Sequence, residues 1–420
     1  MTVKKISACR LCGSADLVEA VRLGEQRLTG VFVKQGSEQP IKSTLDLLYC
    51  NHCSFVQIAQ SVGADVMYKE YWYRSGTNTT MRDHLRDIYQ EILVNIDLHP
   101  GDTVIDIGCN DGTLLENFSE NLTRVGVDPS NAIADIADVD GLIKINDYFS
   151  AEALKNAGIN GQAKVITSIS MFYDLDNPKS FVCDIEKMLS DDGVWVIEMN
   201  YTGKMIDNLG YDMISHEHVG YYTLLTFERA LESTTLKVTD VSFNDINGGS
   251  IRIFVTKKGS FSNRVLAARA VEKEKSYNEL DTYKELAKRM ENHRGALVSF
   301  LSELAAQGKV IYAYGASTRG NTVLQYCDIS TDLITCAVDR NPIKVGLEMA
   351  GGRIPIVSEE YARQNRPDYM LILPYYFAAE FFEREVDFLK AGGEFLIFLP
   401  QIKAVSWQDG VINQQIIWEE

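Results

Sequence analysis

The segment His216-Glu217-His218 places three ionisable side chains next to one another in the chain. Two imidazoles and a carboxylate can supply a general base, a group that orients it and a hydrogen-bond donor. A neutral imidazole can take a proton from a C–H bond that a neighbouring carbonyl has made acidic. The segment therefore indicates base-catalysed chemistry at carbon. One of the two imidazoles could be the base, and Glu217 could orient His218. The alternative for each is an ordinary loop residue, and it is stronger for His216.

A glycine-rich turn, Asp106 to Gly112, precedes this segment. Its glycines allow a tight strand-to-helix turn and close approach of a ligand, and Asp128 follows at the end of the next strand, where it could hold ribose hydroxyls. The turn lacks the middle glycine that a pyrophosphate requires, which disfavours a dinucleotide. Acidic and carbonyl groups suit the positive sulfonium of S-adenosylmethionine (SAM). We expect SAM to be bound by Asp106, Gly108, Asn110, Asp111, Gly112, Asp128, Ser168 and Met171. Asp111 could also cap a helix that begins near Gly112.

Two Cys-x-x-Cys pairs lie near the N-terminus, Cys9 with Cys12 and Cys50 with Cys53. Each pair can place two thiolates on one zinc ion, and together they complete a tetrahedral four-thiolate site. Such a site has no open position for a substrate, so we expect the zinc to be structural. The 37 residues between the pairs must fold as a hairpin of their own.

Composition excludes several classes of protein. The formal net charge of −17 argues against binding to a phosphate backbone. No apolar run approaches the ~20 residues of a membrane span. The N-terminal residues have no apolar signal core, which predicts a cytoplasmic protein. The other four cysteines are scattered, which is typical of reduced thiols.

Hydrophobic periodicity predicts three domains: a zinc-binding domain over 1–78, a doubly wound, Rossmann-like SAM domain over 79–260 and a second Rossmann-like α/β domain over 261–420. The middle domain is expected to contain a helix over 80–98, strands near 103–106, 124–128, 165–168 and 193–198, and a helix over 112–118. A charged helical stretch over 261–306 leads to further strands near 310–315, 333–339, 369–373 and 394–398.

Several motifs occur in a fixed order: both cysteine pairs, Tyr71-Trp72-Tyr73, Asp106 to Gly112, His216-Glu217-His218, Asn247-Gly248-Gly249-Ser250 and Tyr314-Gly315-Ala316-Ser317. Together they resemble the three-domain sugar C-3 methyltransferases of deoxysugar biosynthesis, over essentially the whole chain. The resemblance implies methyl transfer from SAM to C-3 of a nucleotide-diphosphate 4-keto-6-deoxyhexose. It also implies that His218 is the base, with Glu217 and a tyrosine of 71–73 nearby. The candidate catalytic residues are His218, Glu217, Tyr73, Tyr71, Tyr222 and His216.

The glycine turn of the C-terminal domain is the expected site for the nucleotide diphosphate. Helix N-terminal amides, hydroxyls and Arg319 can bind an anion there. Alternatively, it is a vestigial dinucleotide turn that serves only packing, and Arg319 pairs with a surface carboxylate. The run Asn247–Ser250 could approach the ligands or form a simple hairpin turn. The candidate substrate residues are Tyr173, Asn200, Asn247, Gly248, Ser250, Ser317, Thr318, Arg319 and Asn321.

Two other functions fit parts of the pattern. A SAM-dependent O- or N-methyltransferase of a small metabolite would explain the cofactor turn and the zinc site but not the base. A nucleotide-sugar binding protein without catalysis would not need the intact turn with Asp106 and Asp128. No nucleic-acid or membrane partner is expected. The sequence leaves the nucleotide and the oligomeric state open.

Overall fold

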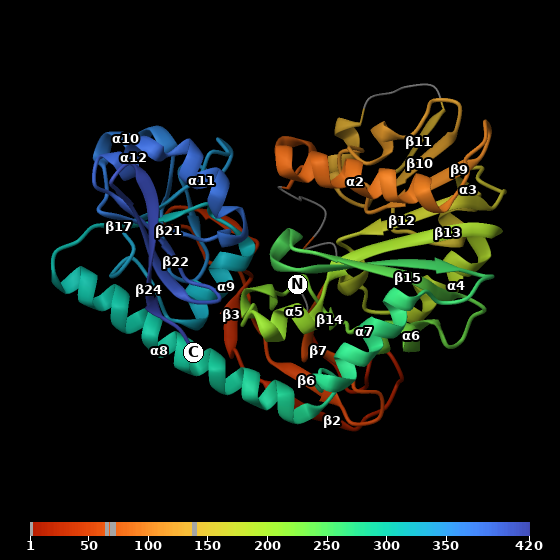
Figure 1. Ribbon diagram of the computed structural model, residues 1–420, viewed down its shortest axis with the longest axis horizontal. Coiled ribbons are helices and arrows are strands. Elements are labelled where there is room, and N and C mark those ends of the chain that lie inside the picture. The colour runs from red at the N-terminus through yellow and green to blue at the C-terminus, as the bar shows by residue number, and fades with distance from the viewer. Residues whose placement is uncertain (1–2, 64–66, 68–72, 137–140) are drawn as a thin grey trace.

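Two seven-stranded sheets dominate the part of the chain that the computed structural model describes, which is residues 3–63, 67, 73–136 and 141–420. Figure 1 shows the middle sheet on the right and the C-terminal sheet on the left. A smaller four-stranded sheet comes mainly from the N-terminal region. This arrangement confirms the predicted fold class. Among the described residues, no helix has both the length and the hydropathy needed to cross a bilayer.

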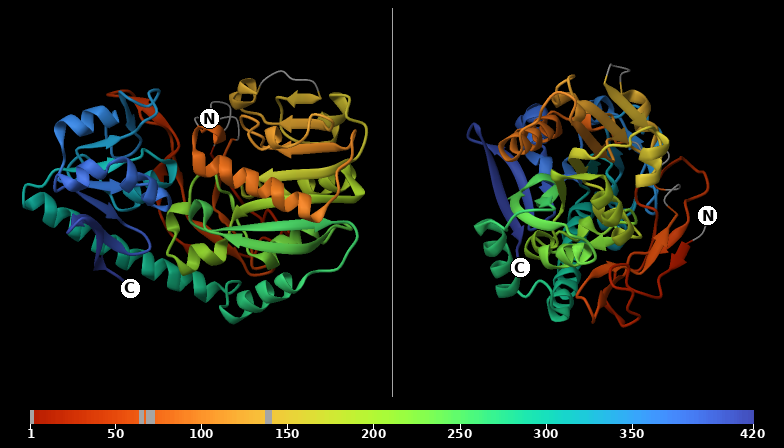
Figure 2. Two further views of the ribbon diagram at one scale, coloured as in Figure 1. Left: turned by 45° about the horizontal axis from the view of Figure 1, so that its top comes forward. Right: turned by 90° about the vertical axis from the view of Figure 1, so that its right-hand side faces the viewer.

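The N-terminal region consists of short strands, which lie along one side of the molecule (Figure 2, right). The four-stranded sheet has the order β14-β7-β6-β2, and its strand β14 (Gly220–Tyr221) comes from the loop that follows His218. Within the segment between the two cysteine pairs, β3 pairs with β5, as the predicted hairpin requires. The strands are β1 (Val3–Lys5), β2 (Leu17–Val21), β3 (Glu25–Arg27), β4 (Phe32–Lys34), β5 (Lys42–Thr44), β6 (Leu47–Cys50), β7 (Val56–Ile58) and β8 (Gln60–Val62).

The middle sheet has the order β11-β10-β9-β12-β13-β16-β15, with five parallel strands followed by two antiparallel ones. Its strands are β9 (Thr103–Ile107), β10 (Thr123–Val127), β11 (Leu142–Ile145), β12 (Ala163–Ile169), β13 (Leu189–Asn200), β15 (Lys237–Asn244) and β16 (Ser250–Thr256). The helices are α2 (Thr79–Asn95), α3 (Ala151–Asn156), α4 (Pro178–Met188), α5 (Thr202–Asp207) and α6 (Leu224–Leu231).

One predicted helix of this domain is wrong. Instead of a helix over 112–118 there is only the 3₁₀ turn η2 (Leu115–Asn117). Gly112 has a φ of +79°, which is the left-handed region, so a right-handed helix cannot begin at that residue.

The C-terminal sheet repeats the same plan in the order β20-β18-β17-β21-β22-β23-β24. Its strands are β17 (Ile311–Tyr314), β18 (Cys336–Val338), β20 (Ile356–Val357), β21 (Tyr369–Ile372), β22 (Glu394–Ile397), β23 (Ile402–Gln408) and β24 (Val411–Trp418). The helices are α9 (Thr318–Tyr326), α10 (Glu359–Asn365), α11 (Ala378–Arg384) and α12 (Val386–Lys390). A further strand, β19 (Leu347–Met349), pairs with β4 and so ties this domain to the N-terminal region.

The predicted helical stretch over 261–306 is two helices, α7 (Asn263–Glu274) and α8 (Leu280–Ala306). Ser276, between them, has a φ of 54°, which interrupts the helix. Figure 1 shows α8 running along the lower edge of the molecule from the middle domain to the C-terminal one. Its Tyr283 also packs against Tyr49 of β6, with ring centroids 6.1 Å apart. One helix therefore supports all three regions.

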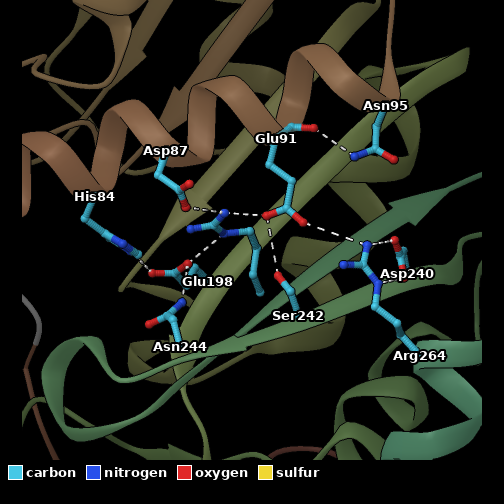
Figure 3. A network of polar contacts seen from close by, with 10 residues as sticks. His84, Asp87, Glu91, Asn95, Glu198, Asp240, Ser242, Asn244 and Arg264 are labelled. Carbon is cyan, nitrogen blue, oxygen red and sulfur yellow. Dashed lines mark hydrogen bonds and ion pairs between the residues drawn. The ribbon is translucent and has the colours of Figure 1, made fainter.

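A buried polar network fixes α2 on the middle sheet (Figure 3). Arg252 of β16 donates from Nε to Glu198 at 2.8 Å and contacts Asp87 at 3.0 Å as well as Glu91 of α2. Glu198 also bonds to His84 of α2. The side chains of Arg252 and Glu198 are only 3% and 2% exposed, and the guanidinium of Arg252 compensates the buried charge of Glu198.

We predict that Arg252→Ala lowers the free energy of unfolding by about 3–5 kcal/mol, because it leaves Glu198 buried without its cation. Arg264→Ala is the matched control. Arg264 also approaches Glu91, but its side chain is 55% exposed, and its loss should cost less than about 1 kcal/mol. Urea unfolding of the two variants makes the comparison. Equal midpoints would show that the network does not hold the domain.

Candidate active site

A cavity of about 640 Å³ lies where the three regions meet. Its wall includes Gly30 from the N-terminal region, Glu217 and His218 from the middle domain, and Ser317 and Thr318 from the C-terminal domain. The predicted cofactor turn, base and nucleotide turn thus open into a single space. A volume of this size suits organic ligands of the size of a cofactor or substrate.

His218 is held in one tautomer. Its Nδ1 lies 2.7 Å from the carbonyl oxygen of Met213. A carbonyl only accepts, so Nδ1 carries the hydrogen and Nε2 keeps a free lone pair. Burial lowers the pKa of His218 to about 4, against which the bond to Met213 acts only in part. His218 is therefore neutral at ordinary pH and has a basic nitrogen. The partner of Nδ1 is the Met213 carbonyl and not the Glu217 carboxyl, because Nδ1 has one hydrogen and donates it to that carbonyl.

Glu217 lies on the cavity wall between two other regions. A Cβ added to Gly30 would collide with its carboxylate and come within 3.2 Å of the Thr318 hydroxyl, so a larger residue at position 30 would displace the end of the Glu217 side chain. Burial raises the pKa of Glu217 to about 7. The carboxyl is therefore largely protonated in mildly acidic solution and can then donate a hydrogen bond.

The loop around His218 is fastened to the N-terminal strands. The amide of Ile58 donates to the carbonyl of Val219 at 3.1 Å, and β14 pairs with β7 immediately beyond that contact. His216 faces the carbonyl of Ser43 at 3.2 Å through Nε2, is 2% exposed and does not line the cavity. His216 therefore connects the loop to the N-terminal region and does not face the cavity.

The structure separates the tyrosine candidates. Tyr222 is buried between Phe55 and Phe172, with ring centroids 4.8 and 5.2 Å away, and does not line the cavity. Tyr222 therefore belongs to the hydrophobic core. Tyr73 lines the cavity and is 42% exposed. Tyr71 lies outside the described residues.

The cofactor turn presents three predicted residues to the cavity: Asp106, Gly108 and Asn110. Asp106 accepts a hydrogen bond from Thr167 at 2.6 Å, yet burial raises its pKa to about 7. A bound cation would relieve this cost. The side chain of Asn110 accepts from the amide of Ser75 at 3.0 Å and donates to the carbonyl of Tyr73 at 3.1 Å. The acceptor-rich wall fits the positive charges of SAM.

The other cofactor candidates support the turn from behind the wall. Asp128 accepts hydrogen bonds from the amides of Asn110 and Ser130, both at 2.8 Å. Asp111 accepts from the amide of Gly76 at 2.8 Å and from Thr113 at 2.6 Å. Ser168 accepts from Trp195 at 3.1 Å. Gly112, Met171 and these three residues are absent from the described cavity wall.

Six of the nine substrate candidates line the cavity: Tyr173, Asn200, Asn247, Ser317, Thr318 and Arg319. Tyr173 packs edge-on against His218, with ring centroids 4.4 Å apart. The other three do not line it. The backbone of Gly248 lies against Arg319, Ser250 donates to the carbonyl of Ile246 at 3.0 Å, and Asn321 donates to the carbonyl of Thr29 at 3.1 Å. Asn247 and its glycines also form the hairpin turn between β15 and β16.

Arg319 departs most from the prediction of a diphosphate ligand. Its Nε donates to the buried Asp212 at 2.9 Å, and its Nη1 donates to the carbonyl of Asn247 at 2.5 Å. The guanidinium also lies over the ring of Tyr376 at 4.6 Å. Its charge is thus paired inside the protein, whereas Ser317 and Thr318 of the same turn line the cavity.

Sequence reasoning missed a set of charged residues at the C-terminal end of the cavity. Asp339, Arg340 and Lys344 all line it. Asp339 follows β18 as Asp128 follows β10, about twenty residues after the glycine turn, which is the spacing of a ribose-binding carboxylate. That repeated spacing was the available signal.

The four predicted zinc ligands come together. The sulfur atoms of Cys9, Cys12, Cys50 and Cys53 all lie within 4.8 Å of one another, and the closest pairs are 3.5 and 3.6 Å apart. Thiolates at ~2.3 Å from a tetrahedral zinc would be about 3.8 Å apart. The geometry therefore fits a closed four-thiolate zinc site that is structural.

Comparison with known proteins agrees with this description. Residues 9–68 match the family "Putative zinc binding domain", residues 78–241 match "Methyltransferase domain", and residues 245–400 match "C-methyltransferase C-terminal domain". The C-methyltransferase NovU of Streptomyces niveus is 30% identical over 411 residues, which is 96% of this chain and 98% of that one. The chain belongs to the C-methyltransferase family. Its cofactors are SAM and zinc.

Solved structures resemble this C-methyltransferase over less than half of the chain. An S-adenosylmethionine-dependent methyltransferase from Clostridium acetobutylicum is 17% identical, covers 42% of this chain and 91% of its own, and has a TM-score of 0.32. The N-methyltransferase NodS from Bradyrhizobium japonicum is 12% identical, covers 42% of this chain and 96% of its own, and has a TM-score of 0.33.

We predict that a strong zinc chelator lowers the melting temperature and abolishes methyl transfer, although no zinc ligand lines the cavity. Loss of the metal frees Cys53, and with it β7, which holds the loop after His218. Zinc released per chain, thermal melting and activity are measured on the same sample. An unchanged melting curve after complete zinc removal would contradict a structural zinc.

Proposed function

We propose that this C-methyltransferase transfers the methyl group of SAM to C-3 of a nucleotide-diphosphate-linked 4-keto-6-deoxyhexose. The observation that carries the proposal is that His218, with its Nδ1 bonded to Met213, and the carboxyl of Glu217 line the same cavity as the cofactor turn and the C-terminal glycine turn. Burial lowers the pKa of His218 to about 4 and raises that of its neighbour Glu217 to about 7. A neutral base beside a neutral acid suits removal of a proton next to a carbonyl.

His218 and Glu217 then have complementary roles. Nε2 of His218 accepts the proton from C-3, which the ketone at C-4 makes acidic. The protonated carboxyl of Glu217, or the phenol of Tyr173 beside His218, donates a hydrogen bond to the ketone oxygen as negative charge develops there. SAM supplies an electrophilic methyl group. The walls of the cavity hold C-3 between the base and that methyl group.

The nucleotide diphosphate is assigned to the C-terminal side of the cavity. Ser317 is the N-cap residue of α9, and its hydroxyl accepts from the amide of Gly320 at 3.1 Å. Both Ser317 and Thr318 line the cavity wall. Helix amides and hydroxyls bind phosphate oxygens. Arg340 adds positive charge on the same wall, whereas Lys344 is paired with Asp339 at 3.2 Å. Asp339 is placed to accept from ribose hydroxyls.

Other predictions remain part of this proposal. They are the domain boundaries after residues 78 and 260, a role for Tyr73, a cytoplasmic location and the absence of nucleic-acid partners. The relative NovU carries the name C-methyltransferase, which supports transfer to carbon.

The test is incubation with SAM and a panel of nucleotide-linked 4-keto-6-deoxyhexoses, followed by mass spectrometry and NMR of the product. We expect one new methyl on C-3. The ketone at C-4 also acidifies the hydrogen at C-5, so the NMR assignment decides between these two carbons. A methyl found on oxygen or nitrogen, or none on any sugar of the panel, would overturn the proposal.

We predict that His218→Ala lowers kcat at least about 10³-fold, since a general base contributes about 10²–10⁴-fold. Glu217→Gln is the matched variant at the adjacent residue. Its amide still donates a hydrogen bond, so the loss should stay below about 100-fold. Affinity for SAM, measured by calorimetry, should be unchanged in both. An active His218→Ala would remove His218 as the base. An inactive Glu217→Gln beside an active His218→Ala would transfer that role to Glu217.

The pKa shifts predict the pH dependence of kcat/KM. His218 must be neutral, and its lowered pKa keeps it so above about pH 4. Glu217 must be protonated, and its raised pKa allows this below about pH 7. We expect the rate to rise up to about pH 5 and to fall above about pH 7. Glu217→Gln should remove the alkaline fall, because an amide does not titrate. An acid limb near the ordinary imidazole value of about 6.5 would contradict a buried base.

A further inference from the structure

The turn η5 (Tyr211–Met213) lies just before His218 in the chain and sets its tautomer. The carbonyl of Met213 accepts the Nδ1 hydrogen of His218 at 2.7 Å. If this carbonyl moved, the hydrogen could pass to Nε2, and the nitrogen needed as the base would be blocked. Whatever fixes η5 therefore also fixes the base.

The side chains of η5 are held by the C-terminal half of the chain. Asp212, next to Met213, is completely buried. Arg319 of α9 approaches Asp212 Oδ2 at 2.9 Å from Nε and 2.6 Å from Nη2, and Tyr375 donates to Oδ1 at 3.3 Å. The Tyr211 hydroxyl lies 2.9 Å from Nδ1 of His293 in α8. A turn of the middle domain is thus anchored from outside that domain.

The ion pair between Asp212 and Arg319 is rigid for electrostatic reasons. Each group would be a buried, uncompensated charge without the other, so the pair resists separation. Arg319 is further fixed by the carbonyl of Asn247 at 2.5 Å and by the ring of Tyr376. Arg319 also directly follows Ser317 and Thr318, the residues assigned to the diphosphate.

We propose that Asp212 is a positioning residue: its ion pair with Arg319 holds η5 so that the Met213 carbonyl keeps His218 in the Nδ1–H form. The inference rests on the proposed role of His218 as the base. It links the nucleotide end of the cavity to the base through one buried contact. The base is then correctly set only when the C-terminal domain is packed against the middle domain.

The test is ¹⁵N NMR of histidine-labelled protein, with His218→Asn used to assign the signals. In the wild type, Nε2 of His218 should show the chemical shift of an unprotonated nitrogen. In Asp212→Asn, both nitrogens should move toward values averaged between the two tautomers. We expect kcat for methyl transfer to fall about 10- to 100-fold, while KM and SAM affinity change less than about threefold, because the loss is in the chemical step.

Glu272→Gln is the matched control. Glu272 is also a buried carboxylate, 2% exposed, and accepts from the amides of Leu224 and Leu225, but it does not line the cavity. It should destabilise the fold without moving the His218 signals. Tyr375→Phe removes only one hydrogen bond to Asp212 and should lower kcat about threefold. It keeps the proposal testable if Asp212→Asn does not fold.

The proposal is overturned if Asp212→Asn folds with wild-type His218 shifts, or, where that variant does not fold, if Tyr375→Phe has wild-type shifts and rates. It is also overturned if Glu272→Gln moves the His218 signals as far as Asp212→Asn does. The NMR measurement needs no sugar, so it stands even if no panel member is methylated. If no sugar is methylated, the proposed substrate is refuted. The NMR spectra alone would then decide whether Asp212 keeps His218 in the Nδ1–H form.

Discussion

The hydrogen bond between His218 Nδ1 and the Met213 carbonyl is the contact on which the rest of the site depends. An imidazole exchanges its proton between two nitrogens unless a partner fixes one of them. A backbone carbonyl does this without adding a charge to the cavity. A carboxylate in the same place would raise the pKa of the imidazole and favour the charged form. The carbonyl therefore leaves His218, the proposed base, both oriented and neutral.

Each of the three regions contributes to holding that base. The N-terminal strands fasten the loop after His218 through Ile58 and Val219, and the four cysteines brace those strands. The C-terminal domain fastens the preceding turn through Arg319 and Asp212. The middle domain supplies the loop itself and the cofactor turn. The position of the His218 side chain thus depends on the zinc site, which does not line the cavity, and also on the C-terminal α/β domain.

Local sequence signals predicted what depends on a few adjacent residues. The cysteine spacing predicted the metal cluster, the strand-and-turn pattern predicted both α/β sheets, and His216-Glu217-His218 marked a segment of which two residues line the cavity. Two errors at the site came from contacts between residues far apart in the chain. Nothing near His216 shows that Ser43 is its partner, and nothing near Arg319 shows that Asp212 neutralises it. The partner of Nδ1 was missed for another reason, since a backbone carbonyl has no sequence signature.

The most direct test of the account is the fate of deuterium placed at C-3 and C-5 of the 4-keto sugar during a single turnover with SAM. If His218 removes a proton before methylation, the product will carry the new methyl on C-3 and will have lost the deuterium from that carbon. A methylated product that retains both deuterium atoms would show that no C–H bond was broken, and would contradict a base-generated carbanion.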